Sequence, residues 1–197
     1  MKLRVPEVVL RLPVWVKSFL ANSEQIFPTI ESRMQLVVTL ARLNVEHRTG
    51  GPFGAGIFEQ EGGRLVAVGV NQVESANCSI AHAEMLAIAV AQHAIGHYDL
   101  GGRKGSAYEL VTNTEPCVMC LGAVCWSGVR QVVCGAHDED AREIGFDEGL
   151  KPQDWVCSLQ SRGISVVQDV LREQAKTVLT EYRKRGGLIY NSRQRHI

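Results

Sequence analysis

The feature that most restricts the fold is a pair of strand-to-helix transitions that each carry candidate metal ligands. One is the stretch TEPCVMCLGAVCWSG at positions 114–128, where an apolar strand pattern gives way to a helix with Pro116 in its first turn. The other is SIAHAEMLAIAVAQHAI at positions 79–95, an apolar helix pattern that follows the strand pattern ending in GVNQV. Two such units in succession predict an α/β fold in which helices pack on a sheet.

Hydrophobic periodicity elsewhere extends this alternation. A hairpin followed by alternating helices and strands predicts one α/β domain with a mixed sheet, and 197 residues suit a single core. We expect residues 28–185 to form this domain, residues 1–27 to pack on it as an arm or extra strand, and residues 186–197 to form a C-terminal segment. The other predicted elements are a helix at 29–51, two strands within 52–73 joined by a turn at 61–64, strands at 106–114, 130–138 and 163–170, a short acidic helix at 140–143 and an amphipathic helix at 169–187.

Composition and charge argue against several classes of partner. Lys+Arg and Asp+Glu both count 21, and a chain without basic excess is a poor match for a long polyanion such as a nucleic acid. No apolar run approaches the ~20 residues of a membrane-spanning helix, and Arg11, Pro13 and Lys17 interrupt what would be a signal sequence. Six cysteines without a regular spacing indicate free thiols. We therefore expect a cytoplasmic protein that binds neither nucleic acid nor membrane.

The three candidate ligands are suited to zinc. Cys117 and Cys120 stand three positions apart at a helix start, so both sulfurs point to one side, and the positive end of the helix favours thiolates. Two thiolates and the imidazole of His82 select zinc. A lone Cys-x-x-Cys is also typical of redox pairs, and a lone histidine is usually a packing residue. Their joint occurrence on two strand–helix units favours the metal site.

The number of ligands indicates a catalytic zinc. Structural zinc sites take four ligands from the protein, whereas His82, Cys117 and Cys120 supply three. We expect one ion per subunit, with a water or hydroxide in the fourth position, because zinc lowers the pKa of a bound water to about 7. Glu84 follows His82 by two positions and is the predicted general acid and base for that water. Its alternative role is a favourable charge in the first turn of a helix.

The motif HAE followed by TEPCVMCLGA resembles the signature of the cytidine deaminase-like zinc deaminases, over about residues 51–140. The resemblance implies a three-layer α/β/α sandwich around a mixed five-stranded sheet, which agrees with the element order above. It implies hydrolysis of an exocyclic amine on a nucleobase ring. The zinc ligands and Glu84 would have the roles just given, and the backbone of Ala83 would lie near the attacked ring carbon.

Three further segments resemble the bacterial guanine deaminases. They are CLGAVCWSGVRQVV, which contains Trp126, the loop AREIGFDEG, and the tail YRKRGGLIYN. The resemblance implies deamination of guanine to xanthine and ammonia, with Glu148 contacting the substrate and assisting proton transfer, and Asp147 beside it. It also implies a homodimer in which the C-terminal segment covers the active site. Exchange of that segment between subunits, as a domain swap, is left open, as is the choice between Asp147 and Glu148.

A flat purine needs apolar faces and a few polar contacts. Phe53, in GPFGAG, is a candidate for a face of the pocket and Trp126 for a wall, although a phenylalanine beside a strand is often a core residue. Asn71 ends a predicted strand, and its amide can donate and accept at once, which matches the N7 and O6 edge of guanine. A turn-forming role is the alternative for Asn71.

Other functions remain open at this stage. A tRNA adenosine deaminase would share HAE and EPC-x-x-C, but it would carry a basic surface and a different loop in place of GFDE. An aminotriazine or another aminopurine would present a similar amino edge. A zinc module without catalysis would need Glu84 only as a helix-start charge.

Overall fold

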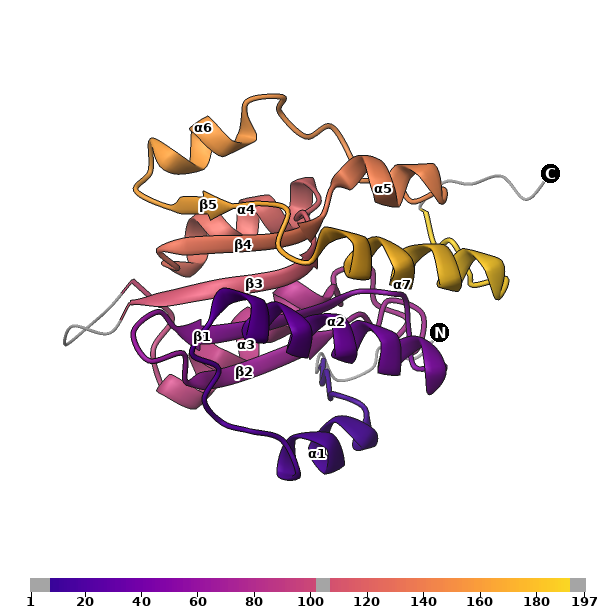
Figure 1. Cartoon of the computed structure of the whole chain (residues 1–197), viewed down its shortest axis with the longest axis horizontal. Coiled ribbons are helices and arrows are strands. Elements are labelled where there is room, and N and C mark those ends of the chain that lie inside the picture. Colours follow the sequence, from indigo (N-terminus) through magenta and orange to yellow (C-terminus); the bar gives the residue numbers. More distant parts are fainter. Residues whose placement is uncertain (1–7, 102–106, 192–197) are drawn as a thin grey trace, which may run out of the picture.

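A computed structural model describes residues 8–101 and 107–191. The first seven residues of the predicted arm and the last six of the predicted C-terminal segment lie outside this described part. Figure 1 shows one layered body, with a twisted sheet between two groups of helices.

The sheet is mixed, as predicted, and has five strands. Its order is β2-β1-β3-β4-β5, with β1 antiparallel to both of its neighbours and β3, β4 and β5 mutually parallel. Parallel neighbours end at the same edge of a sheet, so the segments that follow β3 and β4 start side by side. The strands are β1 (Gly54–Glu59), β2 (Leu65–Val70), β3 (Tyr108–Thr114), β4 (Gln131–Ala136) and β5 (Ser165–Val167).

Helices cover both faces of the sheet, which gives the expected three layers (Figure 1). One buried cluster lies between the sheet and α2 and α7, and a second lies between the sheet and α3, α4 and α6. The helices are α1 (Val14–Ala21), α2 (Ile30–Glu46), α3 (Ala83–Ile95), α4 (Val118–Ser127), α5 (Asp138–Glu143), α6 (Trp155–Gln160) and α7 (Arg172–Lys184). None of the described helices is long and apolar enough to cross a membrane.

One glycine fixes how closely α3 approaches the sheet. A methyl group placed on Gly69, in β2, would lie 2.0 Å from the carbonyl oxygen of Ala83. Any side chain there would push the first turn of α3 away from β2. The start of α3, where His82 and Glu84 stand, is therefore held directly against the strand.

Several boundaries differ from the predictions. The arm forms helix α1 rather than a strand: Val14 and Val16 favour strands in isolation, but Val16 is buried in the core and tertiary packing decides the outcome. The helix expected to have Pro116 in its first turn begins at Val118, because Cys117 keeps an extended backbone and serves as the N-cap. The helix predicted for 29–51 ends at Glu46, and α6 was not predicted.

Candidate active site

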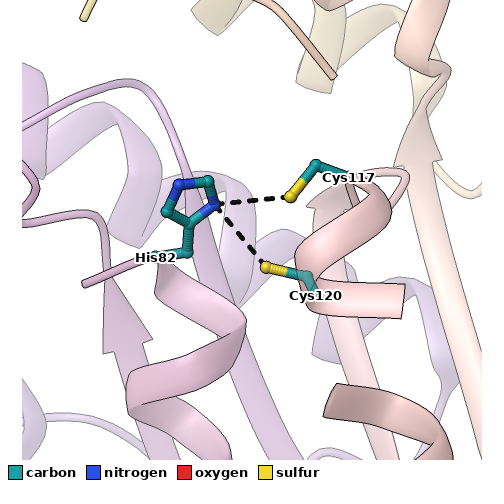
Figure 2. Close-up of side chains that lie close together, drawn as sticks. All are labelled: His82, Cys117 and Cys120. Atoms are coloured by element: carbon teal, nitrogen blue, oxygen red, sulfur yellow. Dashed lines mark hydrogen bonds between the residues drawn. The ribbon is translucent and has the colours of Figure 1, made fainter. Parts of the chain in front are cut away.

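The three predicted zinc ligands meet at the starts of two helices. His82 is the N-cap residue of α3, Cys117 is the N-cap residue of α4, and Cys120 lies in the first turn of α4. The Nδ1 atom of His82 lies 3.6 Å from the Sγ atom of each cysteine, as Figure 2 shows. The two helix N-termini thus point their positive ends at one place.

These distances agree with a zinc ion. Zinc bonds of ~2.0–2.1 Å to nitrogen and ~2.3 Å to sulfur, at a tetrahedral angle, separate the nitrogen and sulfur atoms by about 3.6 Å. The three ligand atoms also all lie within 4.8 Å of one another. The donor set and its spacing therefore match three corners of a tetrahedron, with the fourth corner left to a non-protein ligand.

The two thiols differ in acidity before any metal binds. A hydrogen bond with Cys120, helped by His82 and opposed by burial, lowers the pKa of Cys117 to about 4. The same bond, together with burial, raises the pKa of Cys120 well above its ordinary value. One thiolate is thus already present at neutral pH, and the pair shares the remaining proton. Thiolate is the form that binds zinc.

A cavity of about 300 Å³ opens beside these ligands. This volume lies at the small end of ligand pockets and suits one ring system. Two loops and the C-terminal segment close it, so it is built from parts far apart in the sequence. Its lining includes Phe53, Val73, Ser79, His82, Glu84, Glu115, Cys117, Val118, Met119, Phe146, Asp147, Glu148, Gly149, Tyr190 and Asn191.

Two buried carboxyl groups face this cavity. Glu84 and Glu148 are each 6% exposed, and the structure gives neither side chain a cationic partner among the described residues. Burial, followed by the nearby Cys117 thiolate, raises the pKa of Glu84, and the same causes raise the pKa of Glu148 to about 8. A carboxyl group with a pKa of about 8, such as that of Glu148, can hold a proton near neutral pH and pass it on.

The structure separates the two acidic residues of the GFDE loop. The Asp147 carboxylate accepts a hydrogen bond from the backbone N–H of Gly149 at 2.9 Å and therefore stabilises its own loop. Glu148 is buried, and its backbone carbonyl accepts from Val118 N–H at 3.1 Å. Of the two, Glu148 has the free carboxyl group beside the cysteines. Asp147 lines the outer part of the cavity and is exposed.

Aromatic rings form much of the remaining wall. Phe53 packs edge-on against Phe146, with ring centroids 5.0 Å apart, and Phe146 packs against Tyr190 at 5.1 Å. Phe53 therefore lines the cavity and also packs against the core. Sequence reasoning missed Phe146 and Tyr190. Both stood in segments whose family resemblance was noted, but no local pattern brings position 190 next to position 146.

Asn71 has a more restricted amide than predicted. Its side-chain oxygen accepts from the backbone N–H groups of Gly51 and Val73, both at 3.3 Å. Its Nδ2 atom is buried and has no partner among the residues that the structure describes. Asn71 is fully buried and is not among the residues that line the cavity, and its Nδ2 group is the part of the amide left to donate. The expectation that this amide donates and accepts at once is wrong.

Trp126 does not reach the cavity of its own chain. It is 86% exposed and is absent from the residues that line the cavity. It lies six positions after Cys120, which places the two side chains about 120° apart around the helix axis, so Trp126 points away from the side that carries Cys120. The prediction that Trp126 forms a wall of the pocket is therefore wrong within one chain. Ala83 is fully buried between His82 and Glu84, at the first position of α3.

A second group of acidic side chains lies around Glu115, which also lines the cavity. Glu115, Asp138 and Glu139 have carboxylate oxygens close enough to hold an ion. The Lys151 ammonium group, which is 4% exposed, lies 2.8 Å from Glu115 and 3.9 Å from Asp138. This lysine supplies the positive charge itself, so the group is a buried ion pair rather than a second metal site.

Comparison with known proteins assigns the class. Residues 28–136 match the family described as the cytidine and deoxycytidylate deaminase zinc-binding region. The chain therefore belongs to this family of zinc-dependent hydrolytic deaminases.

Within that family, its similarity to guanine deaminases extends over most of the chain. The guanine deaminase of Bacillus subtilis (strain 168) is 37% identical over 143 residues, which cover 73% of this chain and 87% of that protein. A solved structure of the guanine deaminase from Nitrosomonas europaea is 42% identical, with a TM-score of 0.87, and the match covers 93% of this chain and 100% of that one. A solved structure of a protein in complex with 2,6-diaminopurine is 44% identical, with a TM-score of 0.85 over 94% and 98% of the two chains.

Proposed function

We propose that this chain hydrolyses guanine to xanthine and ammonia, using one zinc ion per subunit whose fourth ligand is a water molecule. The observation that carries this proposal is the placement of Glu84 and Glu148 beside the His82, Cys117 and Cys120 group, in a cavity of about 300 Å³. Similarity to guanine deaminases over most of the chain supports the choice of base.

The two carboxyl groups would divide the proton transfers. A zinc ion held by His82, Cys117 and Cys120 would supply a Lewis acid that makes water nucleophilic at neutral pH. Glu84 takes a proton from the attacking water and delivers it to the purine ring. Glu148, whose raised pKa keeps it protonated near pH 7, donates to the departing amine, which leaves as ammonia. The second proton of the water returns to Glu148 as the ring C=O forms, which restores the acid. The water oxygen replaces that nitrogen on the ring carbon, so guanine and water give xanthine and ammonia.

We assign substrate binding to the apolar rings of the cavity and to buried polar groups that have no hydrogen-bond partner within the described chain. Phe53 and the Phe146 ring offer apolar contact to a flat base, and the buried Tyr190 hydroxyl has no partner within the described chain. We assign Asn71 Nδ2 as a donor to a ring acceptor, such as O6 or N7 of guanine. The backbone of Ala83 stays our candidate for a contact near the attacked carbon.

A nucleic-acid substrate is the less favoured alternative. Net charge is zero, and the cavity is closed on one side by Tyr190, which is largely buried between Phe146 and Gly51. A base presented on an RNA stem would need a wide, basic approach. Aminotriazines and other aminopurines share the amino edge of guanine, and they stay open as additional substrates.

We also propose a homodimer in the cytoplasm, with residues 28–185 as the deaminase domain, residues 1–27 as an arm and residues 186–197 covering the pocket. Tyr190 and Asn191 line the cavity, which supports the covering role of the part of this segment that the structure describes. All six cysteines lie in the described part and are free thiols, which suits a reducing compartment.

The test is release of ammonia from a panel of free bases, nucleosides, aminotriazines and tRNA by the zinc-loaded protein. We expect turnover of guanine with xanthine as product, and no turnover of tRNA. Activity on tRNA without activity on guanine would overturn the proposal. Deamination of another free base in preference to guanine would retain the chemistry and replace the substrate.

A further inference from the structure

A line of hydrogen bonds, partly buried at its outer end, leads from the N-terminal helix α1 to residues that adjoin the cavity. The indole Nε1 of Trp15, in α1, donates to the hydroxyl of Thr49 at 3.0 Å. The Thr49 hydroxyl donates in turn to the Asn44 side-chain oxygen at 2.7 Å. Asn44 is fully buried in the last turns of α2. Three side chains from separate segments thus form one continuous relay.

Asn44 ends this relay on the backbone around the pocket. Its Nδ2 group donates both to the carbonyl oxygen of Asn71, at 2.8 Å, and to that of Gly51, at 2.9 Å. Gly51 N–H in turn holds the side-chain oxygen of Asn71. The Asn44 amide therefore positions Asn71 in two ways. It bonds directly to the Asn71 carbonyl oxygen, and it bonds to Gly51, whose N–H orients the Asn71 side chain.

The backbone at Gly50 lies so close to the backbone at Asn71 that one cannot shift without moving the other. A methyl group on Gly50 would lie 1.8 Å from the carbonyl oxygen of Asn71 and 2.9 Å from Asn44 Nδ2. Asn71 N–H also donates to the carbonyl oxygen of Phe53, which lines the cavity. Because the segments are in backbone contact, a shift of Asn44 is transmitted to Asn71 and Phe53.

We infer that Trp15, Thr49 and Asn44 are positioning residues for substrate binding, and that α1 acts on the pocket through them. The relay holds Asn71, which bonds to two residues that line the cavity: its N–H donates to the Phe53 carbonyl oxygen and its side-chain oxygen accepts from Val73 N–H. This inference rests on the proposed role of Asn71 in binding guanine. Stacking of the Trp15 ring on His47, with centroids 5.2 Å apart, keeps the indole in place for its hydrogen bond.

The experiment compares kcat and KM for guanine in the zinc-loaded protein. Thr49→Val keeps the shape of the side chain and removes the hydroxyl. We expect KM to rise about 5- to 20-fold, with kcat changed less than about twofold, because a lost buried hydrogen bond weakens binding without altering the chemical step. Trp15→Phe, which preserves the stacking on His47, should raise KM in the same direction by about 2- to 5-fold.

A matched control and a double variant separate positioning from general stability. Thr39→Val makes the same chemical change on α2, where the hydroxyl is exposed and bonds only to Gln35 within the helix, and it should leave KM unchanged. In an Asn71→Ala background, Thr49→Val should raise KM by less than about twofold, since the residue it positions is gone. A full, independent rise in that background would overturn the relay, as would a wild-type KM in both Thr49→Val and Trp15→Phe.

Two further comparisons apply if Thr49→Val does not fold or if guanine is not the substrate. Trp15→Phe carries the test alone if Thr49→Val does not fold, as judged by thermal unfolding and zinc content. If the wild-type protein does not turn over guanine, the proposed substrate fails, and the same variants are compared on the base that the panel identifies. A relay that fails on a good substrate is thereby distinguished from a wrong choice of substrate.

Discussion

The backbone N–H of Val118 donates to the carbonyl oxygen of Glu148 at 3.1 Å, so the acidic loop is bonded to the first residue of the helix that carries Cys120. Cys117 immediately precedes Val118. Glu148 and the predicted zinc ligand Cys117, which are far apart in sequence, are thereby kept in fixed relation. This bond explains how a surface loop can present a carboxyl group reproducibly beside a metal site.

Replacing Glu84 by glutamine tests its role in proton transfer. We expect kcat on guanine to fall by about 10²- to 10⁴-fold with zinc retained, because glutamine fills the same space but cannot accept a proton. Glu31, in the first turn of α2, offers a matched control: Glu31→Gln removes a helix-start carboxylate that is remote from the cavity. Equal and small effects of both substitutions would reduce Glu84 to a helix-start charge.

Glu148 should make the metal-free protein less stable as the pH rises. Its pKa is about 8 in the folded chain, against an ordinary value of 4.5, so the folded state binds more protons than the unfolded state between these pH values. The free energy of unfolding therefore falls across this window, by up to a few kcal/mol at about 1.4 kcal/mol per pKa unit.

The Glu148→Gln variant removes this titration and supplies the comparison. Urea unfolding of metal-free protein at pH 5 and at pH 8 should show the variant gaining stability over wild type at the higher pH. A difference between the two proteins that does not change with pH would contradict the raised pKa. On guanine, the zinc-loaded variant should lose most of its turnover, because glutamine cannot protonate the departing amine.

Removing a ligand thiol should abolish metal binding. In Cys117→Ser the bound zinc measured by atomic absorption should fall close to zero, and guanine turnover should disappear with it. Cys125→Ser is the control, because Cys125 lies on the same helix but outside the cavity, and it should keep both metal and activity. Zinc that persists in the Cys117 variant and is lost in the Cys125 variant would show that the site is elsewhere.

Breaking the buried pair of Lys151 and Glu115 from one side should strongly destabilise the protein. Both side chains are 4% exposed, and Gln168 also donates to Glu115. Lys151→Met leaves the Glu115 charge unpaired and should lower the free energy of unfolding by about 3–5 kcal/mol. Adding Glu115→Gln should recover a large part of that loss.

An exposed ion pair provides the comparison for this prediction. Arg64→Met breaks the pair with Glu59 at the surface and should cost less than about 1 kcal/mol by chemical denaturation. Equal losses for Arg64→Met and Lys151→Met would show that burial does not strengthen the inner pair.

The meeting of His82, Cys117 and Cys120 could be predicted because the signal is local. Each ligand stands at the start of a helix that follows a strand, and Cys117 and Cys120 share one turn, so a short segment already fixes their relative directions. Glu148 could be found only through the resemblance of its loop to a known family, since nothing in GFDE alone distinguishes it from a solvated charge.

The parts that were missed depend on contacts between distant segments. Phe146 and Tyr190 meet because the C-terminal segment crosses the acidic loop, where Asn191 donates to the carbonyl oxygen of Gly145 and accepts from Asp147 N–H. The incorrect prediction for Trp126 has a local cause instead. A residue can belong to a recognisable motif and still face away, because the helical repeat sets its direction.

The pairing of β1 with β3 has a consequence for the order of events in folding. Gly56 pairs with Val111, and only this long-range pairing brings the start of α4 alongside the start of α3. Strand pairing across such a long stretch of sequence is slow, so the metal site is not assembled until β1 and β3 have paired. We therefore expect metal to bind after the sheet has formed, so that a chelator returns the protein to a folded, metal-free state rather than unfolding it as it does a zinc finger.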